Sequence, residues 1–212
     1  MKNPLLIRET FPVGPLQCNC SIIGDPVSKK AIVVDPGGNA EEIFNRTQLL
    51  GLNIIALICT HAHFDHFLAA GKLHDKTDAP VYLHKDDRLL WDALEMQCQI
   101  FNVPFQPVPA PHHWLQDDQL LPCCNGITMH TPGHSPGSVS FWFEEAKLLI
   151  AGDTLFRGSI GRTDLWGGNY RQIEKSIRER FYTLDDDVLV VPGHGSLTTI
   201  GCEKTTNMVI RA

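Results

Sequence analysis

The chain has 212 residues, of which 43% are hydrophobic, and a formal net charge of −6 at pH 7. Its length and apolar content are sufficient for one domain with a large core, so we expect a single domain over residues 1–212. The negative charge argues against a nucleic-acid partner, because phosphate binding requires a clustered basic surface.

The sequence shows no sign of a membrane segment. The longest strictly apolar run, residues 54–59, is far shorter than the ~20 residues that a membrane-spanning helix needs. The residues before Arg8 contain too few apolar side chains for the core of a signal peptide. The cysteine count of seven is odd and no export signal accompanies it, which predicts reduced thiols. We therefore expect a cytoplasmic protein without a membrane partner; the oligomeric state is left open.

The first part of the chain predicts strands separated by one helix. Apolar, β-branched runs bounded by turn residues are typical of strands, and a polar start with spaced apolar residues and a final glycine is typical of a helix. The predicted strands cover residues 5–10, 18–24, 29–35 and 53–60, and the predicted helix begins at Asn39 and ends near Gly51.

The rest of the chain repeats this pattern after an irregular segment. Helices are predicted over 66–78, 86–101, 169–184 and near 201–210, and strands over 80–84, 126–131, 137–143, 146–153 and 187–193. Residues 102–113 contain four prolines, which oppose regular structure. In each half, strands occur in a run together with helices, which predicts two mixed sheets packed face to face with helices outside, an αββα sandwich.

Segments that follow four of the predicted strands carry groups that can bind a metal ion. Rigid strands can present such groups at one rim, which is how a preorganised site is built. Imidazoles and carboxylates together suit zinc, manganese or iron, and the lack of a nearby thiolate argues against a structural zinc site. The groups are His61, His63, Asp65, His66, His134, Asp153 and His194.

The spacing within the first of these segments predicts two metal ions. His61 and His63 are two positions apart in an extended segment and can chelate one ion. Asp65 and His66 follow where the chain turns into a helix, so they can face a second ion. The isolated histidines are expected to be structural or solvated instead; these are His74, His84, His130 and the pair His112 and His113.

Taken together, these segments resemble a known family. "THAHFDH", "TPGHSPG", "AGDTLF" and "VPGHG", preceded by "VVDPGG", are similar in type and order to the motifs of the metallo-β-lactamase superfamily. "GRTDL" and "GHGSLTTIGCEK" are similar to the short, single-domain glyoxalase II-like hydrolases of bacteria. The resemblance covers nearly the whole chain and implies an αββα fold with a two-metal site.

The resemblance also implies roles for individual residues. His61, His63 and His134 would bind the first ion, and Asp65, His66 and His194 the second. Asp153 would bridge both ions, and Asp35 would orient a ligand without binding metal. Asp65 and Asp153, with the water that the ions activate, would form the catalytic group. The cofactor implied is two divalent ions, zinc in the first place, with iron or manganese as alternatives.

The implied activity is hydrolysis of small-molecule thioesters of the S-2-hydroxyacylglutathione type. The alternative is a persulfide (sulfur) dioxygenase that uses one iron held by His61, His134 and Asp153. Longer glyoxalase II enzymes have a C-terminal helical domain that supplies much of the glutathione contact; this chain is expected to lack it, and residues 85–113 are expected to cover the pocket instead.

The sequence offers three candidates for substrate contacts. Arg157 and Arg162 follow Asp153 closely and could meet a substrate carboxylate, although they fit equally well as surface arginines in a loop. Tyr170 is a weaker candidate.

Overall fold

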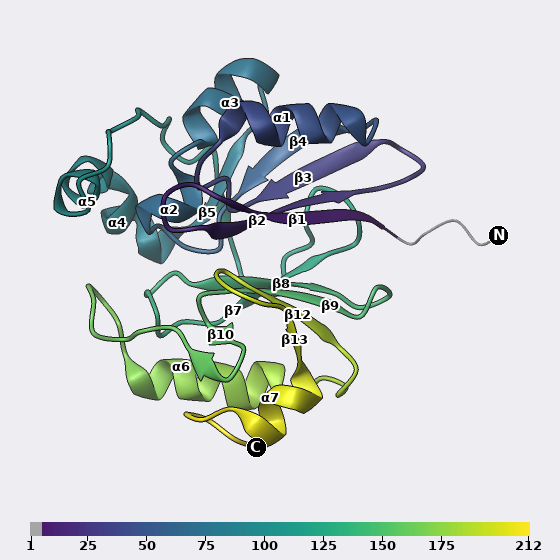
Figure 1. Cartoon of the computed structure of the whole chain (residues 1–212), viewed down its shortest axis with the longest axis vertical. Helices are drawn as coiled ribbons and strands as arrows, with labels where there is room; N and C mark the ends of the chain where they lie inside the picture. Colours follow the sequence, from purple (N-terminus) through teal and green to yellow (C-terminus); the bar gives the residue numbers. More distant parts are fainter. Residues whose placement is uncertain (1–5) are drawn as a thin grey trace.

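The computed structural model describes residues 6–212 and contains two sheets that face each other, with helices on their outer sides (Figure 1). This arrangement confirms the predicted αββα sandwich. Residues 1–5 lie outside the described residues. They include the first residue of the first predicted strand and part of the N-terminal segment in which a signal peptide was not expected.

The first sheet has six strands in the order β1-β2-β3-β4-β5-β6. Antiparallel pairing joins β1 to β2 and β2 to β3, whereas β3 to β6 pair in parallel because helical segments return the chain between them. The strands are β1 (Ile7–Val13), β2 (Cys18–Gly24), β3 (Lys30–Val34), β4 (Asn53–Ile58), β5 (Val81–His84) and β6 (His113–Leu115). β6 follows the proline-rich segment and was not predicted, since three residues are too few to show a pattern.

The second sheet has five strands in the order β13-β12-β9-β8-β7. Only β9 and β12 pair in parallel. The strands are β7 (Ile127–His130), β8 (Val139–Phe143), β9 (Leu148–Gly152), β12 (Leu189–Pro192) and β13 (Thr198–Thr199). A separate hairpin pairs β10 (Leu155–Phe156) with β11 (Ser159–Ile160). β10, β11 and β13 have two residues each and were also missed.

Helices cover the outer face of each sheet (Figure 1). Those beside the first sheet are α1 (Ala40–Leu49), α2 (Phe64–Phe67), α3 (Ala70–Thr77), η1 (Lys85–Asp87), α4 (Arg88–Asp92) and α5 (Leu94–Ile100). Those beside the second are α6 (Tyr170–Ser176), its π-helical continuation η2 (Ile177–Phe181) and α7 (Ile200–Thr206). Within residues 6–212, no helix has the length and apolar character needed to cross a membrane.

Two predicted helices are divided into shorter helices in the structure. The predicted helix 66–78 begins earlier and divides into α2 and α3, because the Ala69 amide donates to the carbonyl of Pro36 instead of to its own helix. The predicted helix 86–101 divides into η1, α4 and α5 near Ala93. The last helix is shorter than predicted, because at Asn207 the backbone leaves the helical region and the side-chain oxygen accepts from the amides of Val209 and Ile210.

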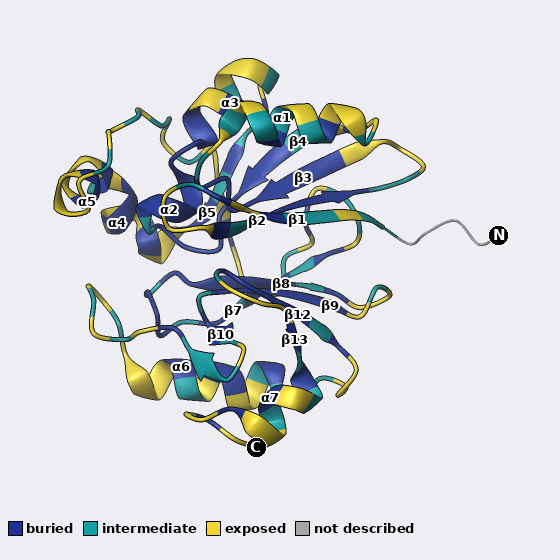
Figure 2. Cartoon of the chain, viewed as in Figure 1, coloured by how far each residue is buried: buried dark blue, intermediate teal, exposed yellow. Residues whose placement is uncertain are grey.

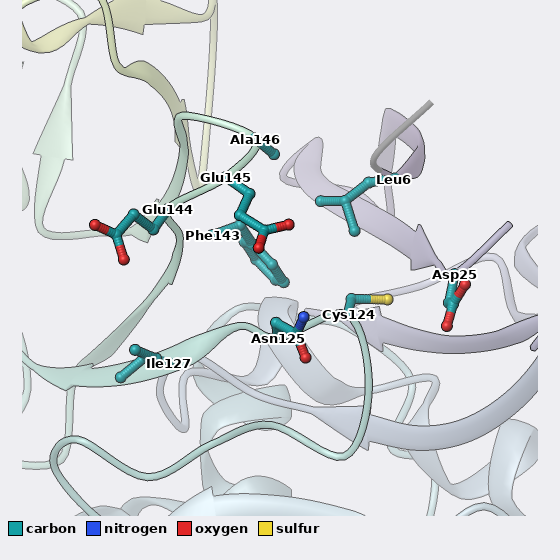
Figure 3. A pocket seen from close by; sticks show the side chains of 9 residues that line it. All are labelled: Leu6, Asp25, Cys124, Asn125, Ile127, Phe143, Glu144, Glu145 and Ala146. Carbon is teal, nitrogen blue, oxygen red and sulfur yellow. The ribbon is translucent and has the colours of Figure 1, made fainter. Parts of the chain in front are cut away.

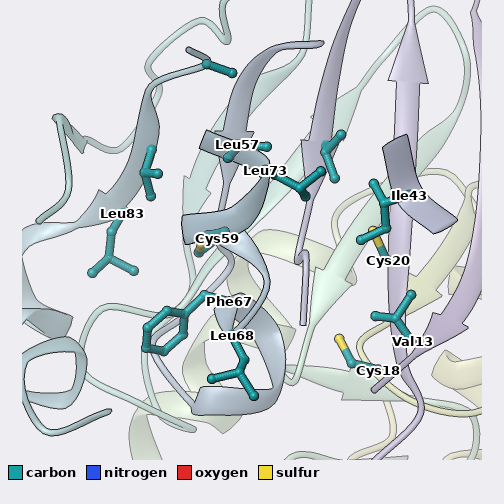
Figure 4. Packing of buried hydrophobic residues seen from close by; sticks show 14 of the residues in the cluster. Val13, Cys18, Cys20, Ile43, Leu57, Cys59, Phe67, Leu68, Leu73 and Leu83 are labelled. Carbon is teal, nitrogen blue, oxygen red and sulfur yellow. The ribbon is translucent and has the colours of Figure 1, made fainter. Parts of the chain in front are cut away.

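Three apolar clusters correspond to the layers of the sandwich. One lies between the first sheet and its helices (Figure 4), one between the two sheets, and one between the second sheet and its helices. The inner strands β2, β3, β4, β8, β9 and β12 are buried along most of their length, while the outward faces of the helices are exposed (Figure 2). Because strands that are covered on both sides cannot shift without losing burial, their carboxyl ends are fixed platforms for loops.

The cluster between the sheets predicts a large cost for truncation of Phe141, a fully buried residue of β8. Phe141→Ala should lower the free energy of unfolding by about 3–5 kcal/mol, because it leaves a cavity in a packed core. Urea denaturation measures this loss. Leu49→Ala, which truncates a side chain that is 88% exposed, is the control and should change stability by no more than ~0.5 kcal/mol. Equal losses in the two variants would contradict the packing described.

Candidate metal centre

The predicted metal-binding groups come together at one rim of the sandwich. His61 and His63 follow β4, and α2 supplies Asp65 and His66 directly afterwards. The other three groups follow strands of the second sheet: His134 lies beyond β7, Asp153 directly after β9 and His194 beyond β12. The two sheets thus contribute ligand-bearing loops from opposite sides.

Three imidazole nitrogens form the first group. His61 Nε2 lies 3.0 Å from His63 Nδ1 and 3.2 Å from His134 Nε2, and His63 Nδ1 lies 2.9 Å from His134 Nε2. Two ligands of one tetrahedral ion, each ~2.0–2.1 Å from it, lie roughly 3.3 Å apart. The three nitrogens therefore have the spacing of one face of such a site.

A carboxylate and two imidazoles form the second group. Asp65 Oδ2 lies 3.1 Å from His194 Nε2 and 3.7 Å from His66 Nε2, and the two imidazole nitrogens are 3.3 Å apart. This group also has the dimensions of a single-ion site.

Asp153 lies between the two groups. Its Oδ1 is 3.4 Å from His66 Nε2, and its Oδ2 is 3.5 Å from His134 Nε2 and 3.8 Å from His194 Nε2. Oδ1 is buried and has no hydrogen-bond partner among the described residues. A buried carboxylate oxygen without a partner costs roughly 1–3 kcal/mol or more, a cost that a bound cation would remove. The residues present therefore fit a divalent metal.

Hydrogen bonds behind the imidazoles fix which nitrogen faces the centre. His134 Nδ1 donates to the carbonyl of Arg162 at 2.8 Å, and His194 Nδ1 donates to the carbonyl of Leu16 at 3.0 Å. A carbonyl oxygen can only accept, so the proton is on Nδ1 and the lone pair of each neutral ring is on Nε2. Both lone pairs face the candidate metal positions.

Asp35 orients two further imidazoles. Its Oδ2 accepts from His66 Nδ1 at 2.9 Å and from Thr60 Oγ1 at 2.7 Å, and its Oδ1 accepts from the Thr60 amide at 2.7 Å. Because the hydroxyl proton of Thr60 is used there, its oxygen accepts from His61 Nδ1 at 3.1 Å. Asp35 has a φ of 53°, a left-handed conformation that non-glycine residues seldom adopt away from special sites. Asp35 thus contacts His66 directly and His61 through Thr60, and a role in orienting these two rings stays the prediction.

The environment favours the metal-binding forms of three of these groups. Burial, reinforced by neighbouring imidazoles, lowers the pKa of His61 well below its usual value and that of His63 to about 3. Burial also opposes ionisation of Asp65, but His66 and His194 together outweigh it and lower its pKa to about 2. Neutral imidazole and ionised carboxylate are the forms that bind metal ions.

The cysteine nearest the centre does not act as a thiolate. Cys18 Sγ lies 3.5 Å from His66 Nδ1, on the side of the ring that faces Asp35. Burial raises the pKa of the Cys18 thiol to about 12, despite the opposing effect of His66. The thiol therefore stays protonated and packs behind the imidazole, in agreement with a site built from histidine and carboxylate.

A close backbone approach requires glycine before His194. A Cβ atom at Gly193 would lie 2.0 Å from Asp153 Oδ1 and 2.9 Å from His66 Cε1. No side chain fits in this space, so the glycine of "PGHG" brings the last histidine close to the other ligands.

Sequence reasoning missed Asp87, which joins two of the ligand-bearing loops. The side chain is fully buried in η1. Its Oδ2 accepts from the Ala62 amide at 2.9 Å and from Ser135 Oγ at 2.7 Å, and its Oδ1 accepts from the Gly137 amide at 2.6 Å. Ala62 separates the first two histidines, and Ser135 follows the third. One carboxylate thus fixes both sides of the first metal group.

Gln97 of α5 has a similar role and was also missed. Its Oε1 accepts from the Phe64 amide at 3.0 Å, and its Nε2 donates to the carbonyls of Ala62 at 3.0 Å and Leu90 at 2.8 Å. The side chain is 1% exposed. A signal was present, because Gln97 lies on the same helical face as the buried Leu90 and Leu94, where a polar residue needs a buried partner.

The ligand groups open onto a cavity of ≈ 230 Å³. Of the three predicted substrate contacts, only Arg162 lines it, and its guanidinium is paired with Asp164 through two contacts of 2.8 Å. Arg157 is exposed in the β10–β11 turn and Tyr170 at the start of α6, and neither lines the cavity. The lining residues are Leu16, His63, Phe64, Asp65, Gln97, Ile100, Phe101, His134, Asp153, Arg162, Leu165, Trp166 and His194.

Two other features of the chain differ from this centre. A cavity of ≈ 250 Å³ between Leu6, Asp25 and Cys124 (Figure 3) has no histidine in its lining. His84 and His130, which the sequence indicated as structural or solvated, stack with ring centroids 4.3 Å apart and an interplanar angle of 16°. With Asp86 they form another group whose possible ligand atoms lie within 4.8 Å of one another. Asp86 is exposed, His84 Nδ1 accepts from the Asp86 amide, and His130 Nε2 donates to the carbonyl of Pro136, so both nitrogens already have protein partners, unlike Asp153 Oδ1.

The Asp87 carboxylate can be tested directly. Asp87→Asn should lower the free energy of unfolding by about 2–4 kcal/mol, because a buried hydrogen bond to a charged group contributes roughly 1.5–3 kcal/mol and the new amide group opposes the donors that the carboxylate accepted. Urea denaturation measures the loss, and Asp92→Asn, an exposed change on the adjoining α4, is the matched control. An Asp87→Asn protein as stable as this control would contradict the role of the carboxylate.

Comparison with known proteins agrees with the fold and with the resemblance in the motifs. The sequence model of the metallo-beta-lactamase superfamily matches residues 13–194. The hydroxyacylglutathione hydrolase GloC of Haemophilus influenzae is 38% identical over 203 residues, which cover 94% of this chain and 95% of that protein.

Two solved structures are similar at the same level. The BLEG-1 B3 metallo-beta-lactamase superposes with a TM-score of 0.89 and 36% identity, covering 97% of this chain and 100% of that one. The protein TTHA1623 in a di-iron-bound form superposes with a TM-score of 0.89 and 35% identity, covering 95% of this chain and 100% of that one. The chain described here therefore belongs to the metallo-β-lactamase superfamily and is a metallo-hydrolase of that fold.

Proposed function

We propose that this chain is a binuclear metal-dependent thioesterase that hydrolyses S-2-hydroxyacylglutathione-type thioesters. The observation that carries the proposal is the pair of ligand groups, each of single-ion size, with Asp153 between them. The 38% identity to a protein named hydroxyacylglutathione hydrolase supports the substrate class.

In this proposal the ligands divide as the sequence predicts. His61, His63 and His134 would bind the first ion, and Asp65, His66 and His194 the second. Asp153 lies between the two groups and would be shared by both ions. Zinc is the expected metal, with iron or manganese as alternatives; the di-iron form of TTHA1623 shows that a relative accepts iron.

The residues of the chain supply the geometry for hydrolysis. When bound, two such ions activate a water molecule near neutral pH and polarise a carbonyl group. Asp65 and Asp153 are the carboxylates among the described residues that line the cavity, and in this proposal they would hold the ions and orient the attacking water. Asp35 keeps His61 and His66 in the required orientation. In the net reaction a bond forms between the water oxygen and the acyl carbon, the C–S bond breaks, and the sulfur leaves with the electron pair and takes up a proton.

Two other activities are distinguished by the same assays. A mononuclear iron dioxygenase would need only His61, His134 and Asp153, so the complete second group favours two ions. The 36% identity to the BLEG-1 B3 metallo-beta-lactamase makes hydrolysis of a β-lactam a further activity to test, and a lactam therefore belongs in the substrate panel.

The first test is removal and return of the metal. Protein loaded with two ions per chain should release thiol from S-lactoylglutathione, lose this activity after treatment with a chelator, and regain it with zinc or manganese. A thiol-reactive dye follows the reaction, and elemental analysis gives the metal content. Fully loaded protein without thioesterase activity would refute the proposal. Uptake of oxygen with glutathione persulfide and one iron per chain would support the dioxygenase instead.

The second test separates the two metal positions. Asp65→Ala should reduce the metal content from two ions towards one while circular dichroism stays unchanged, because the first group is intact. Loss of an outer partner of a ligand already costs ~10–100-fold, so loss of this ligand should lower kcat/KM by about 100-fold or more. Asp75→Ala, which removes an exposed carboxylate of α3, is the control and should retain both ions. Two tightly held ions in Asp65→Ala would show that the assignment is wrong.

A further inference from the structure

Part of the wall of the metal-centre cavity consists of large apolar side chains that are exposed or half-buried. The residues come from separate segments: the β1–β2 turn, the end of α5 and the loop that follows Gly161. Large apolar side chains gathered around a concave site mark the place where an apolar ligand is buried. The residues are Leu16 (45% exposed), Ile100 (59%), Phe101 (46%), Trp166 (47%) and the half-buried Leu165.

The cavity offers no unpaired positive charge among its described lining residues. Arg162 is the one lysine or arginine in the lining, and Asp164 neutralises it through a two-point contact. Glutathione carries two carboxylates and an ammonium group outside its sulfur. These charges would find no partner of opposite sign on the apolar wall, and desolvating them there would cost free energy.

The size of the cavity points the same way. At ≈ 230 Å³ it is smaller than the ~300–1,000 Å³ of pockets that enclose a drug-sized ligand. The space can therefore enclose the thioester and one compact group beside it, while the rest of a tripeptide conjugate would lie outside the cavity.

Part of the wall is held rigidly next to the ligands. The rings of Phe101 and Phe64 are 5.0 Å apart, and Phe64 directly follows His63. The side-chain oxygen of Gln97, one helical turn before Phe101, accepts a hydrogen bond from the Phe64 amide. Trp166 differs, because it lies in an exposed loop next to Gly167 and Gly168, and its truncation leaves the core intact.

We propose that the pocket selects thioesters by a compact apolar group next to the scissile bond, aliphatic or aromatic, and leaves any charged tail in solvent. This inference rests on the proposed thioesterase function and names the substrate class of that site. The apolar group can belong to the acyl part or to the thiol part, and the assay has an arm for each.

The experiment compares kcat/KM for metal-loaded protein on four thioesters. An acetyl thioester of a small neutral thiol gives the baseline, a phenylacetyl thioester of the same thiol tests the acyl side, and an acetyl thioester of benzyl mercaptan tests the thiol side. Acetylglutathione thioester tests the charged tail. At least one apolar substrate should exceed the baseline about tenfold or more, and the glutathione thioester should stay within about threefold of it.

The variant Trp166→Ala should lower the ratio of kcat/KM for the preferred apolar thioester to kcat/KM for the baseline thioester by about fivefold or more, mainly by raising KM for the apolar thioester. Trp114→Ala is the matched control, because this tryptophan is 38% exposed but lies on β6 outside the cavity. An equal effect of Trp166→Ala on all substrates would contradict a wall that recognises one group.

The outcomes separate the inference from the function on which it rests. A tenfold preference for the glutathione thioester over the baseline would overturn the inference and leave the thioesterase intact. If no thioester is hydrolysed, the proposed function fails. Calorimetry with an unreactive benzyl thioether then still tests whether the cavity wall binds an apolar group. That binding should weaken about tenfold in Trp166→Ala, and unchanged or undetectable binding would overturn the inference as well.

Discussion

The mutual approach of nitrogen lone pairs at the rim is the constraint on which the rest of the structure depends. Three imidazole nitrogens lie 2.9–3.2 Å from one another, a spacing that neutral rings do not favour by themselves. His134 is fixed from behind by a backbone carbonyl, and His61 by the Asp35 network through Thr60, whereas His63 Nε2 is buried without a hydrogen-bond partner among the described residues. His194 and His66 of the second group are fixed in the same two ways, and Asp87 holds the loops in place.

These supporting contacts explain why so many polar groups are buried in an otherwise apolar protein. A buried carboxylate is tolerated when each oxygen accepts hydrogen bonds, and both Asp35 and Asp87 satisfy this condition. Asp153 is the exception, with one buried oxygen left without a partner. The contrast separates carboxylates that hold the loops from one that is available to a cation.

The fold was predictable because its signals are local. Buried strands such as β4 and β9 are continuous apolar runs, and the metal-binding groups follow them within a few residues. The missed features depend on distant partners. The break between α2 and α3 depends on a carbonyl of Pro36, and the role of Asp87 depends on amides 25 and 50 residues away.

Arg162 illustrates the same limit for substrate contacts. Its position after Asp153 made it a reasonable candidate, and it does line the cavity. Its guanidinium, however, is paired with a carboxylate only two residues along the chain, while its backbone carbonyl fixes His134. The positive charge of Arg162 is thus neutralised by Asp164, and the contact of Arg162 with the candidate ligands is made by a backbone oxygen, an atom that every residue has.

The segment over residues 85–113 combines contacts that support the candidate metal centre with part of the cavity wall. On its inner side, Asp87 and Gln97 hold the loops of the first metal group; on its outer side, Ile100 and Phe101 form part of the cavity wall. Because Gln97 lies on α5 and Phe101 is its C-cap residue, moving this helix to reshape the wall would also move the amide of Phe64 and the histidine before it. The shape of the wall can therefore change by side-chain replacement at exposed positions, but a displacement of the helix would disturb the candidate ligands. This couples the shape of the cavity to the geometry of the ligand groups.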